Sequence, residues 1–496
     1  MAVAEDLARV PQSAAPAVGE LKPPWIVKFL YSFGQTIESG YIGVATYIFF
    51  YYTAVLGLSG SLVGLALAIS MAVDAVFDPL IGSLSDNVRS KFGRRLPVMI
   101  VGAPLMALST GLLFAPPTAL APFATFLWLV VMKIAIRAFA SMFNLPYFAL
   151  GAEMATGYVE RSSIVAYRTF GGIALGVVLT ILALSFVFAG PGGLQRLENY
   201  PVFGWTCAAL FLGAAAICCL GVWRYAASLP QPLTPARPLL RALAPEVIEI
   251  FKNRSFRTLF FSALLAYVAA GLNGALNTHL AVFVWRVRSE DLQTITFAFL
   301  AGITAGVPLT PVLLRFMEKR SVVLVGLAMV VVCWSTLPSL RAAGLFMLTG
   351  TAVVPWLAVN IAFGGAGIGF LAIAYPSMMA DATDEHEVKF GTRREGMYFA
   401  GLGFAAKAAA GGGALLGGIA IDLLHFPKEA GRHVGAILPE DVLAGLAIAW
   451  GPVAGFIAAV SALMLIPYAI TRRRHDDIAA ALKIKRAEDV AAGRSS

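Results

Sequence analysis

Two acidic residues, Asp74 and Asp78, lie inside a long apolar segment, in the stretch DAVFDPLIGSLSDN. A carboxylate at the centre of a bilayer costs about 2.5–3.5 kcal/mol on insertion scales, so acids in such segments usually serve a function. Residues four positions apart share one face of a helix, where two carboxylates repel each other. Binding of Na⁺ between them, or of H⁺ to one of them, would relieve this repulsion. The pair is therefore a candidate functional site, and pairing with Lys or Arg for packing alone is the alternative.

Two basic residues, Lys133 and Arg137, have the same spacing in another apolar segment, and Ser141 and Asn144 continue their helical face. Exposing two cations to lipid is expensive, so this stripe is expected to face the centre of the molecule. There the cations could hold an anionic solute through charge-assisted hydrogen bonds. They could equally pair with Glu38 and with the two buried acids, and Lys133 could instead extend outward to the membrane surface.

Membrane-spanning helices must position these residues, and the composition provides them. Of the 496 residues, 59% are hydrophobic and 13% are charged, whereas a soluble domain carries roughly 25% charged residues. A spanning helix needs about 20 mostly apolar residues. The sequence therefore predicts an all-α polytopic membrane protein with about twelve transmembrane helices. These are expected at residues 26–55, 60–86, 96–115, 122–150, 163–190, 203–227, 257–285, 292–316, 321–340, 345–380, 396–424 and 442–470.

The basic residues indicate how the chain is oriented in the membrane. They are concentrated in alternate loops, in the central segment and at the end of the chain. Loops rich in Lys and Arg remain in the cytoplasm, so both termini are expected there. The expected location is a plasma membrane, specifically a bacterial inner membrane. This topology also accounts for the net charge of +9. The lipid bilayer, and not nucleic acid, is therefore the expected large-scale partner.

The central segment divides the helices into two sets of six, as in transporters that bind solute near the midplane between two repeats. A short internal echo supports related halves, because GRRLPV opens the third predicted helix and EKRSVV the ninth. We expect a monomer with a disordered cytoplasmic tail at 1–24, six-helix bundles at 25–227 and 257–470, a cytoplasmic linker at 228–256 and a cytoplasmic tail at 471–496.

Sequence patterns of enzymes and ATP-driven pumps are missing. The chain has no Walker motif, no nucleophile elbow and no Cys/His set at metal-binding spacing. Its four cysteines lie in apolar runs and are expected to be free, buried thiols. The Gly-rich stretches GGAGIGF and AAAGGGALLGG suit close packing of membrane helices. We therefore expect no enzymatic activity and no cofactor.

The string DAVFDPLIGSLSDNVRSKFGRRLP contains a loop motif similar to that of the major facilitator superfamily. Its elements here are Gly82, Asp86, Gly93, Arg94 and Arg95, with a longer gap than usual before the second glycine. The whole string resembles the glycoside–pentoside–hexuronide:cation symporter family, the group of the melibiose permease. The stretches NLPYFALGAEMATGYVERSSIVAYR, FKNRSFRTL, MMADATDEHEVKFGTRREGMYF and YAITRRRHDDI follow the same family pattern in the right order.

The resemblance implies a major facilitator fold and cation-coupled symport of a glycoside by alternating access. The family's cation-binding acids match Asp74 and Asp78, and its hydroxyl on the fourth helix matches Ser141. Sodium-using members have an Asn just before the second acid, where this chain has Phe77, which offers no oxygen ligand. H⁺ is therefore a serious rival to Na⁺ as the coupling ion. The expectation leans slightly to Na⁺, bound transiently by Asp74 and Asp78 and not as a resident metal.

The resemblance also implies a solute site. The family's acid on the first helix matches Glu38, its arginine on the fifth matches Arg168 and its lysine on the eleventh matches Lys407, while Asn144 replaces an acid on the fourth helix. Loss of that negative charge, with the basic stripe that includes Lys133 and Arg137, favours an anionic solute such as a hexuronide. A salt bridge across the bundle is the alternative role for Lys407.

Charged residues near the predicted cytoplasmic ends of the helices resemble the family's gates. They are Asp86, Arg94 and Arg95 in the first half, and Asp381, Asp384, Arg393 and Arg394 in the second. Glu153, Glu160 and Arg161 are expected to play the same part after the fourth helix. Ordinary charge at the membrane surface is the alternative for both groups.

The resemblance leaves the solute open. Lysophospholipid carriers share part of the pattern, so a cation-coupled lipid carrier is the first alternative to a glycoside symporter. A membrane sensor or scaffold that transports nothing is the second, and it would not require the buried carboxylates.

Overall fold

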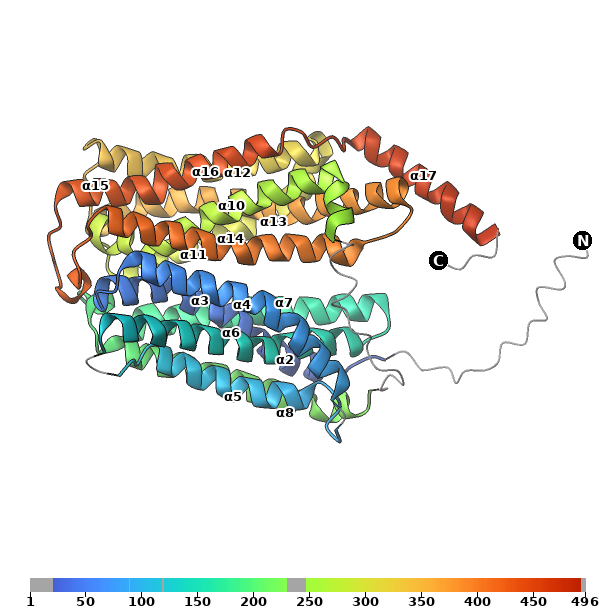
Figure 1. The fold of residues 1–496 in the computed structure, drawn as a ribbon, viewed down its shortest axis with the longest axis horizontal. Coiled ribbons are helices and arrows are strands. Elements are labelled where there is room, and N and C mark those ends of the chain that lie inside the picture. Colours follow the sequence, from blue (N-terminus) through green and yellow to red (C-terminus); the bar gives the residue numbers. More distant parts are fainter. Residues whose placement is uncertain (1–20, 89, 118–119, 230–246, 492–496) are drawn as a thin grey trace, which may run out of the picture.

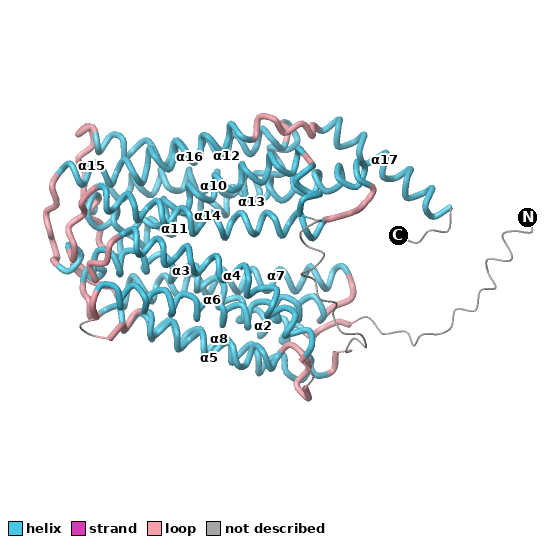
Figure 2. The backbone as a smooth tube through the Cα atoms, in the orientation of Figure 1, coloured by secondary structure: helices cyan, strands magenta, loops and turns pink. Residues whose placement is uncertain are grey.

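The computed structural model describes residues 21–88, 90–117, 120–229 and 247–491. Within these ranges the chain folds into helices and loops, without strands. The helices run along the long dimension of the molecule, and the loops lie at its two ends (Figures 1 and 2). Ten helices of the described part are long and apolar enough to cross a membrane. The helical run 25–55 and helix α4 are two further long segments, so the predicted all-helical membrane fold is confirmed.

The helices of the first half lie close to their predicted positions. The first is a continuous run of four pieces, α2 (Trp25–Ser32), η2 (Phe33–Gln35), α3 (Thr36–Phe50) and η3 (Tyr51–Val55). It is followed by α4 (Gly60–Asn87), α5 (Leu96–Leu113), α6 (Pro122–Glu153), α7 (Tyr158–Ile181) with η4 (Leu182–Val187), η5 (Gly193–Gln195) and α8 (Asn199–Ala227).

The second half repeats this plan and lies beside the first as a separate bundle (Figure 1). Its elements are α10 (Arg254–His279) with η6 (Leu280–Val284), α11 (Ser289–Phe316), α12 (Lys319–Ala342), η7 (Gly350–Val353), α13 (Val354–Phe390), α14 (Glu395–Leu423), η8 (Ala430–Arg432), α15 (Glu440–Ile448), η9 (Ala449–Val453) and α16 (Ala454–Met464). Helix α13 continues beyond the predicted end at 380. The acids Asp381 and Asp384 therefore lie on a helix and not in a loop.

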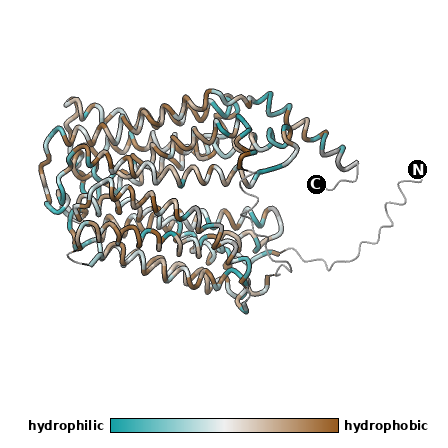
Figure 3. Tube along the Cα trace, viewed as in Figure 1, coloured by the Kyte–Doolittle hydropathy of each residue, from teal (hydrophilic) through white to brown (hydrophobic). Residues whose placement is uncertain are grey.

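A last helix, α17 (Arg472–Ala491), forms where the sequence predicted only a cytoplasmic tail. It extends from one end of the bundles, which we call the α17 end, and α15 lies at the opposite end, the α15 end (Figure 1). Ile478 and Leu482 lie on one face of α17 and are buried in the core of the second half, beside Tyr398 and Tyr468. Hydrophilic residues gather at both ends and along α17, whereas the bundles are mostly hydrophobic (Figure 3).

The two halves are joined at the α15 end. The carboxylate of Asp422, at the end of α14, accepts hydrogen bonds from the backbone N–H groups of Gly60 (2.8 Å) and Ser61 (2.9 Å) and from the Ser59 hydroxyl (2.7 Å). It thereby caps the first turn of α4, whose N–H groups have no partner within the helix. Arg432 donates to the backbone carbonyl of Val55 at 2.7 Å, which adds another contact between the halves.

Helices α4 and α14 approach closely at the α15 end and separate toward the α17 end. A methyl group placed on Gly60 would lie 2.5 Å from the carbonyl oxygen of Gly418, and one on Gly64 would lie 2.6 Å from the backbone of Leu415. A methyl group on Gly82 or Gly403, nearer the α17 end, would meet nothing within 4 Å. Close packing of small residues therefore holds the halves together at the α15 end.

Candidate functional site

The predicted cation residues come together midway along the helices. Asp74 and Asp78 lie on one face of α4, and Ser141 faces them from α6. The Ser141 hydroxyl lies 2.6 Å from Oδ1 of Asp78 and 3.3 Å from Oδ1 of Asp74. Asp74 is 1% exposed, and Asp78 is partly buried. The continuous helix α4 explains this arrangement, because its i and i+4 side chains project in the same direction.

Two basic side chains already neutralise this acid pair. Arg137 of α6 forms an ion pair with Oδ2 of Asp74 through its Nη2 atom. Lys407 of α14 places its Nζ atom 2.7 Å from the same oxygen of Asp74 and forms a second ion pair with Oδ2 of Asp78. Two acids and two bases thus form one cluster, and α14 brings one of the bases from the other half. Such pairing is what buried charges require.

Lys133 lies behind this cluster. It is 1% exposed, and its ammonium group donates a hydrogen bond of 2.7 Å to the Tyr41 hydroxyl. The Tyr41 ring also lies 4.7 Å from the Lys133 Nζ atom and 5.0 Å from the Arg137 guanidinium carbon. Both cations can interact with the face of the ring. Lys133 therefore points inward, not outward to the membrane surface, and Tyr41 is a member of the site that the sequence analysis missed.

The remaining predicted solute residues form two separate contacts. The amide nitrogen of Asn144 lies 2.6 Å from Oε2 of Glu38 and joins the first helical run to α6. Arg168 of α7 lies over the ring of Phe148, with 4.9 Å between the guanidinium carbon and the ring centroid. This ring belongs to α6 and lies outside the carboxylate cluster. The structure thus gathers Glu38, Asn144, Arg137 and Lys407 near the acid pair. Arg168 contacts the Phe148 ring instead.

At the α17 end of the first half, the three predicted gate residues meet through Glu153. Arg95 pairs with Asp86 at 2.5 Å and with Glu153 at 2.8 Å, and it donates to the Ser85 hydroxyl at 3.0 Å. Arg94 pairs with Glu153 at 2.7 Å. The start of α5 is thereby tied to the ends of α4 and α6. Glu160, also named in the sequence analysis, pairs instead with Lys28 of α2.

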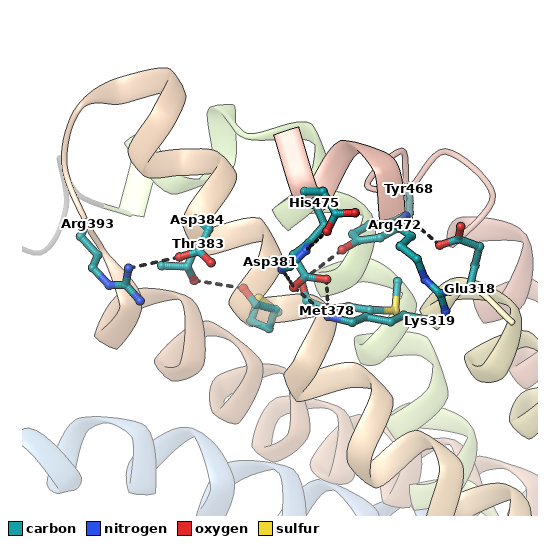
Figure 4. Close-up of polar contacts among 12 residues, drawn as sticks. Glu318, Lys319, Met378, Asp381, Thr383, Asp384, Arg393, Tyr468, Arg472 and His475 are labelled. Carbon is teal, nitrogen blue, oxygen red and sulfur yellow. Dashed lines mark hydrogen bonds and ion pairs between the residues drawn. The ribbon is translucent and has the colours of Figure 1, made fainter. Parts of the chain in front are cut away.

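The predicted gate of the second half divides into separate pairs (Figure 4). Asp384 pairs with Arg393 at 3.1 Å. Asp381 turns away from them, toward Lys319 at the start of α12, with 2.7 Å between Nζ and Oδ2. Arg394 lies 3.9 Å from Glu249.

Two residues from the end of the chain complete the surroundings of Asp381. The Nε2 atom of His475 on α17 lies 3.6 Å from Oδ1 of Asp381 (Figure 4). Tyr468 donates from its hydroxyl to the Met378 carbonyl at 3.2 Å. Burial, together with the nearby charges of Asp381 and Glu385, raises the pKa of Tyr468, so its hydroxyl stays protonated as a donor. No local pattern in the sequence predicted that this part of the chain would fold back here.

The two halves form the same kind of ion pair at the α17 end, between the start of one helix and the end of the next. In the first half, Arg94 at the start of the third helix pairs with Glu153 at the end of the fourth. In the second half, Lys319 at the start of the ninth helix pairs with Asp381 near the end of the tenth. The echo between GRRLPV and EKRSVV in the sequence marks this repeat.

Known proteins are similar to this chain over most of its length. A family model described as MFS/sugar transport protein matches residues 35–472. The isoprimeverose transporter of Lactiplantibacillus pentosus is 24% identical over 90% of this chain and 89% of its own length. The putative glycoside/cation symporter YagG of Escherichia coli K12 is 24% identical over 91% of this chain and 93% of its own.

Among solved structures, the nucleoside transporter NupG is similar in fold. It superposes with a TM-score of 0.58 and 15% identity, over 89% of this chain and 98% of NupG. At this identity the likeness concerns the fold alone.

Proposed function

Because this chain belongs to the MFS/sugar transport protein family, we propose that it is a cation-coupled symporter of a glycoside-like solute that works by alternating access. The names of its relatives, an isoprimeverose transporter and a putative glycoside/cation symporter, support the solute class and the coupling. The major facilitator fold predicted from the sequence is confirmed, and the chain is an integral membrane protein whose relatives are transporters and not enzymes.

The ion pairs of Lys407 carry the proposal. Lys407 belongs to the second half, whereas Asp74 and Asp78 belong to the first, so these pairs bridge the halves at the acids. Residues that alternately pair with each other and with a transported cation can link ion binding to movement of the halves. When Na⁺ or H⁺ neutralises the acids, Lys407 loses its attraction to them. The two halves can then move apart around Lys407 and the acid pair and come into contact at another place.

The described conformation corresponds to one state of this cycle. We take both termini as cytoplasmic, as the basic loops predict, in the inner membrane of a bacterium. The α15 end then faces the periplasm, and there Asp422 caps α4 and the glycines of α4 and α14 touch. The α17 end, where α4 and α14 separate, is cytoplasmic. The structure would then be an inward-facing state, with the ties of Glu153 and Asp381 as parts of the cytoplasmic gates.

The solute would bind beside the acid pair, between Glu38, Asn144, Arg168 and Lys407. The basic side chains of this region, which also include Lys133 and Arg137, outnumber the acidic ones by four to three. A glycoside with a carboxylate, such as a hexuronide, would match this excess and accept charge-assisted hydrogen bonds. Arg168 is placed for that contact, because it is partly exposed and held by a ring instead of an acid.

Uptake into proteoliposomes tests the proposal. We would compare a neutral glycoside, a glucuronide and a lysophospholipid under an imposed cation gradient. We expect the wild type to accumulate a glycoside and Asp78→Asn to accumulate at least tenfold less of it. Asp441→Asn is the matched control, because Asp441 is an exposed acid on α15. Transport of the lysophospholipid alone would favour the lipid carrier. Equal accumulation by Asp78→Asn and the wild type would contradict the role given to the acid pair.

A further inference from the structure

Arg137 and Asp74 form a pair that belongs to one half of the molecule. Both side chains are buried, with Asp74 1% and Arg137 9% exposed, and they come from the neighbouring helices α4 and α6. A guanidinium does not lose its proton in a protein. Breaking such a pair would leave a buried charge without a partner, which is strongly unfavourable. The pair is therefore expected to persist while the halves move relative to each other.

Lys407 differs from Arg137 in the half to which it belongs and in its exposure. It reaches the acids from the other half, and its side chain is 38% exposed on a flexible stem. Rocking of the halves can withdraw Lys407 without deforming either bundle. Asp78 then loses its basic partner and keeps the Ser141 hydroxyl, whereas Asp74 keeps Arg137. The two acids are therefore unequal: one changes its partner during the cycle and the other does not.

This inequality bears on the coupling ion. A small hard cation such as Na⁺ is held by several oxygen ligands, with carboxylates as the usual charged ones. The Oδ2 atom of Asp74 is occupied by the guanidinium, and a Na⁺ between the acids would lie beside that permanent positive charge. Phe77 adds no oxygen. With Arg137 in place, the residues do not fit a Na⁺ site.

We propose that Arg137 is the permanent counter-ion of Asp74 and excludes Na⁺ from the acid pair, so that the proposed symport is independent of Na⁺. The inference rests on the proposed function for its transport consequence, but ion binding itself can be measured without a solute. It assigns Arg137 a role in ion selectivity, instead of the direct solute contact expected from the sequence.

The test compares the purified wild type with three variants in Na⁺ and in choline at equal ionic strength and pH. Arg137→Gln removes the charge, Arg137→Lys keeps it, and Phe77→Asn supplies an amide oxygen next to Asp78. The readouts are the melting temperature, which reports Na⁺ binding, and counterflow of a glycoside, which needs no ion gradient. We expect no Na⁺-specific change in the wild type, Arg137→Lys or Phe77→Asn. In Arg137→Gln we expect Na⁺ to raise the melting temperature and to increase counterflow several-fold.

Several results would overturn the inference. One is a Na⁺-specific rise in the melting temperature or counterflow of the wild type. Another is a gain of Na⁺ response by Phe77→Asn alone, which would make Phe77 the determinant and would hold even if Arg137→Gln failed to fold. A folded Arg137→Gln without any Na⁺ response is the third. Absence of glycoside counterflow in every protein would contradict the proposed function, whereas the melting temperatures would still decide the question of Na⁺ binding.

Discussion

Lys133 shows at the scale of a residue how a buried charge depends on one neighbour. Its helical spacing predicted that it would lie on the same face as Arg137, and both lie inward. The sequence could not predict the partner, because Tyr41 lies on another helix and a hydroxyl in an aromatic run carries no local signal. Pairings between distant helices depend on tertiary packing, and this also explains why Asp381 pairs with Lys319 instead of the neighbouring arginine.

The Tyr41 hydroxyl is expected to stabilise the fold, because it accepts the hydrogen bond of the buried Lys133 ammonium group. Tyr41→Phe keeps the ring beside Lys133 and Arg137 but removes the oxygen that accepts the hydrogen bond. A buried donor left unsatisfied costs about 1–3 kcal/mol, and more when it is charged. We therefore expect a lower melting temperature for Tyr41→Phe and recovery in the double variant with Lys133→Met, which has no ammonium to satisfy. A double variant no more stable than Tyr41→Phe would argue against this account.

At the scale of elements, the apolar segments predicted the spanning helices closely, because bilayer thickness fixes their length and composition. Helix α17 was missed because most of its residues are charged or small, and its few large apolar residues do not make a long apolar stretch. Only docking against the second half reveals its buried face, formed by Ile478 and Leu482. The extension of α13 to Phe390 was missed for a similar reason, since its polar last turns lie beyond the apolar segment.

Docking of α17 can be tested with one charge on its buried face. Ile478→Asp would place a carboxylate in the core around Tyr398 and Tyr468, in place of an aliphatic side chain whose burial contributes about 1.5–3 kcal/mol. We expect α17 to detach and trypsin to cleave rapidly after Arg472, Arg473 and Arg474. Ile484→Asp on the same helix is the control, because Ile484 is 61% exposed. Equal cleavage rates in the two variants would mean that α17 is not held by this face.

At the scale of the molecule, the two halves meet through small residues and a few polar contacts at the α15 end. The first turn of α4 depends on Asp422 of the other half for its hydrogen-bond acceptor. Such a contact exists only while this end is closed, so it stabilises one conformation relative to the other. The sequence indicated two halves, but it could not show which end was closed, because alternating states share one sequence and differ only in the contacts between bundles.

Removing the Asp422 carboxylate should therefore shift the balance of conformations. Loss of a helix cap costs about 0.5–2 kcal/mol, which corresponds to a change of roughly 2- to 30-fold in the equilibrium between two states. Spin labels on the exposed residues Leu197 and Ile437 would report the separation of the halves at the α15 end, and the four native cysteines are buried. We expect Asp422→Ala to increase the population with long label distances, and Asp441→Ala to leave it unchanged. The same distance distribution in both variants would show that the cap does not hold this end closed.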